Sequence, residues 1–363
     1  MPGDFDTTSG GFRYDRRLVA SLRDAGDEVT VHSVPWRRYP FGLADAPRTP
    51  LARFASGTDV VVVDELAHPT FVALEAETPV VALVHHLRCD EGRADAPLAR
   101  ALERRFLSRV DAAVCTSSAT ARSVRELVST ALGPGSADGP TGVPTVVAPP
   151  TDDQFDPDVA AAEIDDRAAA DPFRVVFVGS VLPRKRPLAL VDALSGLEGE
   201  WTATLVGPQP DATYADRVRR RCRRRGVTER VTLTGPLSTG ELAGVLRRSH
   251  VLALPSAHEG FGIAALEGMG FGLPAVVTHS GGATDLVTHG ETGVLVPPDG
   301  VGAVYAALST LASDRDRLAR MGRAALERHQ AHPPWPETVA RVRAFLSGVV
   351  DGQADRQSAV VAE

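Results

Sequence analysis

Two glutamates in the second half of the chain stand eight residues apart around a glycine-rich turn. Glu259, Gly260, Phe261 and Gly262 follow an apolar run, and Glu267 lies in a helix expected to begin near Gly262. Along a helix this spacing would give a rise of about 12 Å. Two carboxylates that far apart suit hydrogen bonding to the hydroxyls at both ends of an elongated ligand, of the length of a nucleoside diphosphate sugar from ribose to hexose.

The turn between these glutamates has two alternative interpretations. One is a capped helix with Glu267 facing solvent. The other is a ligand site, because Gly260 and Gly262 allow close approach of the backbone and a helix N-terminus attracts phosphate. The turn follows an apolar strand, and open α/β sheets bind ligands beyond the carboxyl ends of their strands. We therefore favour the ligand site.

A second candidate is the segment 177–185, in which a strand leads into Gly179, Ser180 and Lys185. Lys185 is the single lysine among 39 basic residues. A compact ammonium would stabilise charge on a departing diphosphate. The alternative is an ordinary loop lysine between Arg184 and Arg186.

Two further groups occur at strand or helix ends in the first half. Gly10 and Gly11 directly precede a helix expected over 12–25, where close approach to a ligand or a simple turn would both explain them. His85 and His86 end the apolar strand 80–84, where a ligand-binding and a structural histidine are nearly equally expected.

Acidic pairs in the first half leave their roles open. Asp64 and Glu65 follow a strand and would either bind acceptor hydroxyls or cap the next helix. Asp4 and Asp6 imitate a metal-binding Asp-x-Asp but have no strand before them, so we interpret them as loop.

Strand-like and helix-like segments alternate along the whole chain, which predicts an α/β fold with two doubly wound sheets. In the first half we expect strands at 29–34, 59–63, 80–84, 112–115 and 145–148, with helices at 12–25, 69–76, 97–109 and 119–132. In the second half we expect strands at 174–178, 203–206, 231–234, 251–254, 275–277 and 294–296, and helices at 302–311 and 314–329.

A chain of 363 residues exceeds what one core usually supports, so two domains are expected. Proline-rich and polar segments separate an N-terminal domain over 1–150, a linker over 151–172 and a C-terminal domain over 173–332. A last helix over 333–350 and a disordered tail over 351–363 complete the chain.

The spacing of Glu259 and Glu267 resembles the Glu-x7-Glu hallmark of the retaining family-4 glycosyltransferases, and the resemblance covers nearly the whole chain. It implies the GT-B fold, with two Rossmann-like domains facing across a cleft and a C-terminal helix that crosses back. The implied reaction transfers a hexose from a nucleotide diphosphate sugar to an acceptor hydroxyl on a glycan or a lipid-linked molecule. It requires neither a metal ion nor another cofactor.

The resemblance also implies roles in the C-terminal domain. Lys185 would bind the donor diphosphate in one loop with Gly179 and Ser180, and Glu267 would bind the ribose. The family usually has Arg at the position of Ser180. Either Arg184 or Arg186 substitutes for it, or the Ser180 hydroxyl binds phosphate.

The donor sugar would meet both domains in this scheme. Glu259 and His85 would contact the sugar, the latter with His86 close behind. Gly10 and Gly11 would face the donor phosphates. The remaining donor-binding positions implied by the family motif are Gly260, Phe261 and Gly262.

Composition limits the surroundings in which the protein works. Three scattered cysteines fit a reducing compartment, and neither a signal peptide nor a transmembrane segment is evident, so we expect a cytoplasmic protein. The segment 36–41 interleaves aromatic residues with arginine and suits peripheral contact of the N-terminal domain with the inner membrane face. Arginines crowd the helix at 217–225, which we interpret as solvated surface. Nucleic acid is not an expected partner.

Two rival functions remain open from the sequence. A catalytically weak homologue that binds nucleotide sugar as a partner subunit would explain Ser180, and it would bind donor without turnover. A sugar-nucleotide epimerase on the same fold would act with no acceptor present.

The start of the chain carries a separate expectation. A doubly wound domain needs an apolar strand directly before its glycine loop, but only a short polar stretch precedes Gly10. We therefore expect Met1 to be internal, with the missing strand encoded upstream.

Overall fold

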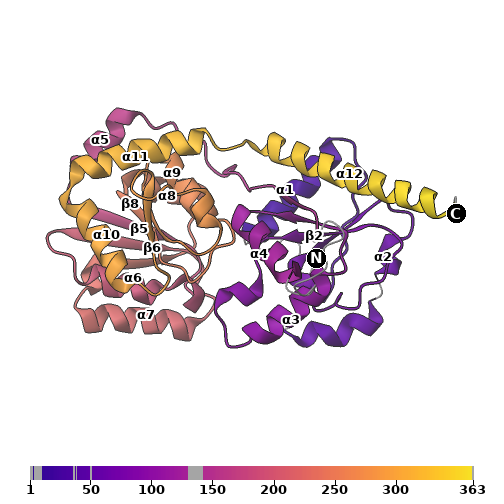
Figure 1. Ribbon diagram of the computed structural model, residues 1–363. Coiled ribbons are helices and arrows are strands. Elements are labelled where there is room, and N and C mark those ends of the chain that lie inside the picture. Colours follow the sequence, from indigo (N-terminus) through magenta and orange to yellow (C-terminus); the bar gives the residue numbers. More distant parts are fainter. Residues whose placement is uncertain are drawn as a thin grey trace. The chain divides into compact units, whose positions relative to one another are not determined.

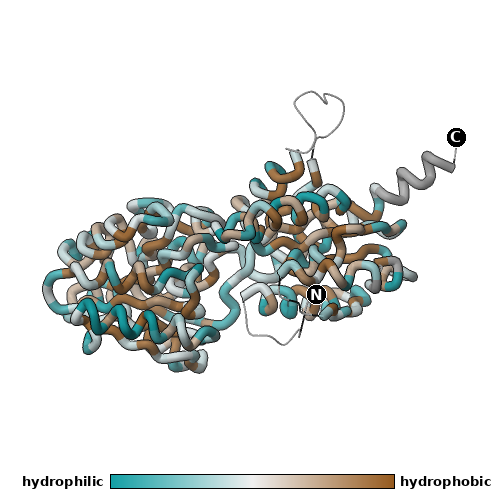
Figure 2. The backbone as a smooth tube through the Cα atoms, turned by 90° about the horizontal axis from the view of Figure 1, so that it is seen from below, coloured by the Kyte–Doolittle hydropathy of each residue, from teal (hydrophilic) through white to brown (hydrophobic). Residues whose placement is uncertain are grey.

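The chain divides into two compact units, each built around a parallel β-sheet (Figure 1). The computed structural model describes residues 3, 10–35, 37, 39–49, 51–129 and 142–361. The first unit comprises Met1–Pro150 and Pro333–Glu363, and the second comprises Thr151–His332. Hydrophobic segments gather in the interior of each unit, and hydrophilic segments lie on its outside (Figure 2).

The described sheet of the first unit has the order β1-β2-β3-β4, with all its strands parallel. The strands are β1 (Val61–Asp64), β2 (Val80–Val84), β3 (Ala112–Cys115) and β4 (Thr145–Val147). The helices are α1 (Gly10–Asp24), α2 (Ala52–Ala55), α3 (Ala96–Leu107), α4 (Ser118–Ser129) and α12 (Trp335–Val361), with 3-10 turns at Phe41–Arg48, Glu65–Ala67 and Arg88–Glu91.

The two faces of this sheet bury different sets of side chains because alternate strand residues point to opposite sides. Val81 and Leu83 of β2 pack with Leu18 of α1 and Val339 of α12. The opposite face belongs to a separate cluster that includes residues of α3 and α4. The last helix therefore completes the first unit, as expected of a C-terminal segment that crosses back.

The described sheet of the second unit has the order β10-β9-β8-β5-β6-β7 and is also parallel throughout. Its strands are β5 (Phe173–Val178), β6 (Trp201–Val206), β7 (Val231–Gly235), β8 (Val251–Leu254), β9 (Ala275–Thr278) and β10 (Gly293–Val296). Its helices are α5 (Ala161–Ala169), α6 (Pro187–Leu194), α7 (Ala212–Arg225), α8 (Thr239–Arg248), α9 (Ile263–Gly270), α10 (Val301–Ser313) and α11 (Arg315–Gln330), with 3-10 turns at Pro183–Lys185, Thr228–Arg230 and Gly282–Asp285.

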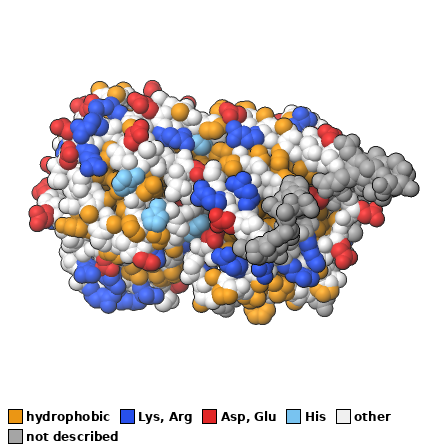
Figure 3. Space-filling view, in the orientation of Figure 1, with side chains coloured by type: hydrophobic (Ala, Val, Ile, Leu, Met, Phe, Trp, Pro, Cys, Tyr) orange, Lys and Arg blue, Asp and Glu red, His pale blue; other side chains and the backbone are white. Residues whose placement is uncertain are grey.

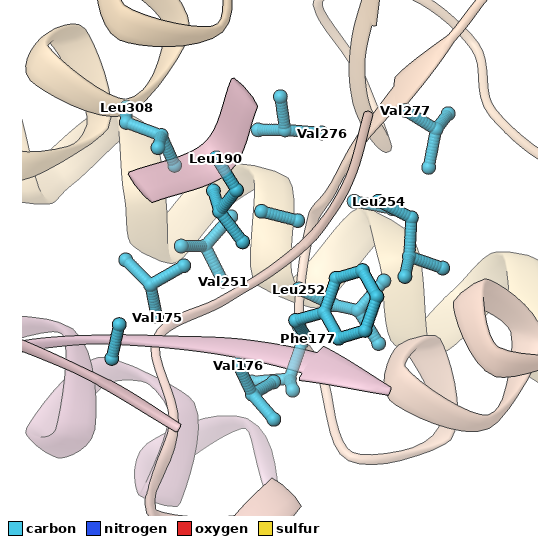
Figure 4. Packing of buried hydrophobic residues seen from close by; sticks show 14 of the residues in the cluster. Val175, Val176, Phe177, Leu190, Val251, Leu252, Leu254, Val276, Val277 and Leu308 are labelled. Carbon is cyan, nitrogen blue, oxygen red and sulfur yellow. The ribbon is translucent and has the colours of Figure 1, made fainter. Parts of the chain in front are cut away.

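The strand order of this second sheet reverses between β5 and β8. From β5 the chain proceeds outward through β6 and β7, then returns to β8 on the other side of β5. Helices α6, α7 and α10 form one packed group, and α5, α9 and α11 form another. Val176, Phe177 and Leu252, from the two strands at the reversal, lie close together in the core (Figure 4). Ligands of open α/β sheets bind at such a reversal.

Several expected elements are absent or differ in the described structure. Among the described residues the segment 29–34 is not a strand; only Val34 forms an isolated bridge, and its carbonyl accepts a hydrogen bond from the Gly3 N–H at 2.8 Å. The segment 69–76 makes successive turns rather than a helix. The expectation that Met1 is internal stays a prediction.

Two boundary expectations were also wrong. The segment 151–172 is not simply a linker, because α5 lies within it and buries Ile164 in the core of the second unit. The alternation of short alanine and acidic residues hid this helix. The segment from 351 was expected to be disordered, but α12 continues to Val361. None of the described helices is long and apolar enough to cross a membrane.

Trp335 should be the main anchor of α12. Its ring is buried, lies edge-to-face against Tyr14 at 5.1 Å, and its Nε1 donates to Ser21 Oγ at 2.8 Å. Trp335→Ala should lower the free energy of unfolding of the first unit by about 3–5 kcal/mol. Hydrogen exchange followed by mass spectrometry would localise the loss to peptides of that unit. The exposed Ser347→Ala on the same helix serves as control, and equal exchange in both variants would contradict this role.

Candidate active site

The loops that follow β5 and β8 meet at the point where the strand order reverses. The Ala257 N–H donates to the Arg184 carbonyl at 2.8 Å, and Arg184 Nη1 donates to the His258 carbonyl at 3.3 Å. These bonds join the lysine loop to the glutamate loop. The two strongest sequence motifs of the second unit thus form one local site.

Lys185 and Glu259 form a buried ion pair between these loops. Lys185 Nζ lies 2.6 Å from Glu259 Oε1 and 2.7 Å from Oε2, and their side chains are 16% and 8% exposed. The Ser256 hydroxyl also donates to Glu259 Oε1. The sequence predicted both residues at the site but not their direct contact.

The environment of the pair shifts both pKa values. Burial lowers the pKa of Lys185, and the attraction of Glu259 offsets this only in part. Burial alone would raise the pKa of Glu259, but the charges of Lys185 and Arg184 and the hydrogen bonds from Lys185 and Ser256 outweigh it, so this pKa is lowered. Glu259 is therefore an ionised acceptor at neutral pH.

Two glycines let the backbone close around this pair. The Gly282 N–H donates to the Glu259 carbonyl at 2.8 Å, and a Cβ on Gly281 would lie 2.0 Å from that oxygen. A Cβ on Gly207 would lie 2.3 Å from the carbonyl oxygen of Gly179. Both glycines also have positive φ, so the site requires glycine there for its conformation and its space.

Glu267 lies on α9 and is buried, which excludes the alternative of a solvent-facing residue. Gly262 precedes this helix with φ +94°, a conformation that favours glycine, and buried Phe261 contacts the His332 ring at 5.7 Å between centroids. Because α9 begins only at Ile263, the helical rise estimated between the two glutamates does not apply to the whole interval. Both Gly260 and Ser180 are half-buried in the same loops.

His85 and Gly11 come together in the first unit. His85 directly follows β2, and a Cβ on Gly11 would lie 3.2 Å from its ring, while Gly10 begins α1 in an exposed position. His85 Nε2 bonds to Asp15 Oδ1 at 3.0 Å, and its backbone N–H donates to Glu65 Oε2 at 3.1 Å. The sequence predicted two of these residues, Gly11 and His85, as members of one site.

The sequence patterns did not identify Asp15 as a site residue, although its position on the helix is unusual. It occupies the buried face of α1 with Leu18 and Leu22, where an apolar residue is expected. Its Oδ2 atom is buried and has no hydrogen-bond partner. A charged residue on the apolar stripe of an amphipathic helix points to a buried partner elsewhere in the chain.

The buried carboxyls around His85 hold a proton on its ring. Burial alone would lower the pKa of His85, but Asp15, Glu65 and Asp64 raise it to about 10. Burial and the charge of Asp15 raise the pKa of Asp64 to about 7, while burial and Asp64 raise that of Glu65. Asp64 also caps the next turn through the Leu66 N–H at 2.7 Å, so the capping alternative is correct for this residue.

Asp15, Asp64 and His85 could together offer three metal ligand atoms, which lie within 4.8 Å of one another. An imidazole binds metal only through an unprotonated nitrogen. The raised pKa of His85 keeps its ring protonated at neutral pH in this structure. Asp4 and Asp6 lie outside the described residues.

A pocket of about 380 Å³ lies in the first unit beside Glu65. Arg88 covers one face of the Tyr39 ring at 4.2 Å, and His86 Nε2 bonds to Glu91 Oε1 at 2.9 Å. Both basic and acidic side chains line this pocket, which suits a ligand rich in hydroxyls. In the segment 36–41, Trp36 and Arg38 lie outside the described residues, and Phe41 is exposed.

Asp15→Asn should lower the pKa of His85, because the ring loses its nearest carboxylate. The folded pKa of about 10 lies above the ordinary value of 6.5. The stabilisation from the charged ring is therefore fully present below pH 6.5 and is lost as pH rises through about 10. Titration of the His85 ring by NMR, with His32 as an exposed reference, would measure the change. A wild-type His85 that titrates near 6.5 would contradict the assignment.

Two family models match the chain, one in each unit. The model described as Glycosyl transferase 4-like domain matches residues 10–132, and Glycosyl transferases group 1 matches residues 162–328.

Curated relatives cover a large part of the chain. GDP-mannose-dependent alpha-(1-6)-phosphatidylinositol monomannoside mannosyltransferase of Mycobacterium tuberculosis is 32% identical over 263 residues, which are 69% of this chain and 66% of that protein. D-inositol 3-phosphate glycosyltransferase of Nocardia farcinica is 31% identical over 269 residues, or 71% of this chain and 57% of that protein. The chain thus spans less than two thirds of the length of either relative.

Solved structures share the fold over nearly the whole chain. Sucrose-phosphate synthase from Thermosynechococcus elongatus has a TM-score of 0.78 at 22% identity, covering 96% of this chain and 97% of that one. Anabaena HepE in complex with UDP-glucose has a TM-score of 0.66 at 20% identity, covering 94% and 90%. These similarities show the GT-B fold, and together with the two family models they show that the chain belongs to glycosyltransferase family 4.

Proposed function

We propose that the chain is a retaining glycosyltransferase that moves a hexose from a nucleotide diphosphate sugar to an acceptor hydroxyl. The observation that carries this proposal is the buried Lys185–Glu259 pair at the strand reversal of the second sheet. An ammonium has three N–H donors, and Glu259 occupies two of them with its oxygens. The third suits a diphosphate oxygen of the donor.

Different residues of the second unit bind different parts of the donor. Lys185 stabilises the negative charge that grows on the diphosphate as the glycosidic bond breaks. Glu259, ionised and fixed, accepts a hydrogen bond from a sugar hydroxyl, and Glu267 accepts from the ribose. Gly260, Phe261 and Gly262 bring the backbone of the turn to the donor.

The acceptor attacks from the face that the diphosphate leaves, with no dedicated general base. Charge stabilisation comes from the protein, so neither a metal ion nor another cofactor is required. This part of the proposal rests on the family resemblance and on the cationic loop around Lys185.

Ser180 stands where the family usually has a second cation. Arg184 is the better substitute, because its charge already acts on both Lys185 and Glu259. Arg186 instead pairs with Asp299. We propose that Arg184 supports the diphosphate while Ser180 and Gly179 contact it through neutral groups.

We also assign the first unit to the sugar and the acceptor. By family resemblance, a protonated His85 contacts the donor sugar, and Gly10 and Gly11 lie near the donor phosphates. The pocket beside Glu65 receives the acceptor. The name of the Mycobacterium relative gives GDP-mannose as donor and phosphatidylinositol monomannoside as acceptor, and that of the Nocardia relative gives D-inositol 3-phosphate as acceptor. Both names support a polyol or lipid-linked glycan hydroxyl as the acceptor here. We propose cytoplasmic action, with peripheral contact to the membrane.

Ser180 also supports the second candidate function, a weakly active homologue that binds nucleotide sugar as a partner subunit. Turnover separates the two. Release of nucleoside diphosphate from GDP-mannose or UDP-glucose supports the transferase, whereas binding of both donors with no release under any acceptor supports the subunit.

Lys185→Met and Glu259→Gln should be strongly non-additive. Each single variant leaves one buried polar or charged group without its partner and should lower the free energy of unfolding by about 3–5 kcal/mol. The double variant should recover part of this loss, while kcat stays lowered by about 10²–10³-fold in all three. Chemical denaturation and steady-state kinetics would measure both effects.

The exposed pair of Arg323 and Asp165 gives a matched control for that cycle. Its removal should change stability by less than about 1 kcal/mol and leave kcat unchanged. Additive losses at Lys185 and Glu259 would show that the two side chains act independently.

Glu267→Gln should weaken donor binding more than turnover. Loss of a charged acceptor for the ribose hydroxyls costs about 1.5–3 kcal/mol, or about 10- to 150-fold in affinity. Calorimetric titration with GDP-mannose and UDP-glucose would measure it, with the exposed Glu291→Gln as control. An unchanged donor affinity would remove Glu267 from the ribose site.

A further inference from the structure

Helix α7 presents a continuous basic face to solvent. Seven of the nine residues from 217 to 225 are arginine. Four of them, Arg217, Arg220, Arg223 and Arg224, are exposed and follow the three- and four-residue spacing that places side chains on one side of a helix. We call these four the arginine face. Blue side chains gather at the lower left of Figure 3, where Figure 1 places α7.

The other arginines of α7 form ion pairs with acidic neighbours. Arg221 and Arg225 both pair with Asp192, and Arg219 pairs with Asp216. For the arginine face, no ion pair with an acidic side chain occurs within the described part of the chain; Arg217 only stacks over the Tyr214 ring at 5.5 Å. The positive charge of this face is therefore available to bind a negatively charged partner from outside the chain.

The arginine face is held rigidly. Tyr214, Ala215, Val218 and Cys222 bury the opposite side of α7 in the core of the second unit. Asp211 caps the start of the helix by accepting from the Tyr214 N–H at 2.9 Å. One side of this helix is therefore buried, and the arginine face lies on the solvated side.

Arginine in place of lysine throughout the chain does not explain this clustering. Like charges three and four residues apart destabilise a helix. The repulsion among Arg217, Arg220 and Arg224 is retained although any neutral polar residue would relieve it. A partner that supplies several negative charges in a row would offset the repulsion.

We propose that the arginine face binds the phosphate groups of anionic phospholipids and so holds the protein at a membrane surface. Guanidinium groups bind phosphates through two parallel hydrogen bonds. The face is convex and extends for about 10 Å from Arg217 to Arg224. It therefore meets a flat array of headgroups without any change in the fold.

The same features argue against nucleic acid as the partner. Single-stranded nucleic acid is bound by basic grooves with aromatic side chains for base stacking. The one aromatic residue of α7, Tyr214, is buried and covered by Arg217. The chain as a whole carries a net charge of −7, which disfavours a long polyanion that would extend beyond this face.

Co-sedimentation of the full chain with vesicles tests the proposal. We expect binding to phosphatidylcholine vesicles that contain phosphatidylglycerol, no binding to phosphatidylcholine alone, and release at high salt. Replacing the four residues of the arginine face with glutamine should weaken binding by about a hundredfold or more. The thermal unfolding midpoint should stay the same or rise because the repulsion is relieved, which shows that lost binding is not lost folding.

A matched variant removes the same charge elsewhere. Exposed arginines of the first unit, replaced together by glutamine, serve for this purpose: Arg100, Arg104, Arg122 and Arg125. Equal loss of binding in both variants, or binding that persists without the arginine face, would overturn the proposal and point to net charge or to the segment 36–41. Binding of a single-stranded oligonucleotide that disappears with the arginine face would assign the face to nucleic acid. No glycosyl transfer is needed, so failure here leaves the proposed reaction standing.

Discussion

The ion pair of Lys185 and Glu259 is the interaction on which the proposed donor-binding edge of the second sheet depends. Each charge, buried without a partner, would cost several kcal/mol of desolvation free energy. The pair is stable because the two charges attract each other and Ser256 donates a further hydrogen bond to Glu259. One residue comes from the loop after β5 and the other from the loop after β8. This ion pair and the hydrogen bonds between the two loops therefore fix both loops at the reversal of strand order.

The first unit also buries charged side chains, but there the acidic groups outnumber the basic one. There a single cationic ring, His85, sits among carboxyls that outnumber it, and protons on Asp64 and Glu65 reduce the excess. In the second unit, one buried positive and one buried negative side chain balance each other. In the first unit, protonation of buried carboxyls reduces the excess negative charge. Because the pKa of Asp64 is raised to about 7, a change of pH near neutrality should disturb the surroundings of His85.

Local patterns predicted much of this arrangement, and long-range contacts did not follow from them. The strands of the second sheet were recognisable as apolar runs, and the loops after β5 and β8 carried glycines beside charged residues. Asp15 and His85 are 70 positions apart, so only the fold reveals their bond. The segment 29–34 has strand-forming residues but is not a strand in the described structure, and α5 was concealed by the polar residues that surround Ile164.

The single lysine of the chain also determines which covalent chemistry the protein can undergo. Among these 363 residues, Lys185 is the one side chain that amine-directed reactions, such as acetylation or labelling by activated esters, can modify. Burial lowers the pKa of Lys185, which favours its neutral, nucleophilic form, yet the carboxylate of Glu259 and a side-chain exposure of 16% shield it. The reactivity of this one side-chain amine therefore reports directly on the state of the proposed donor site.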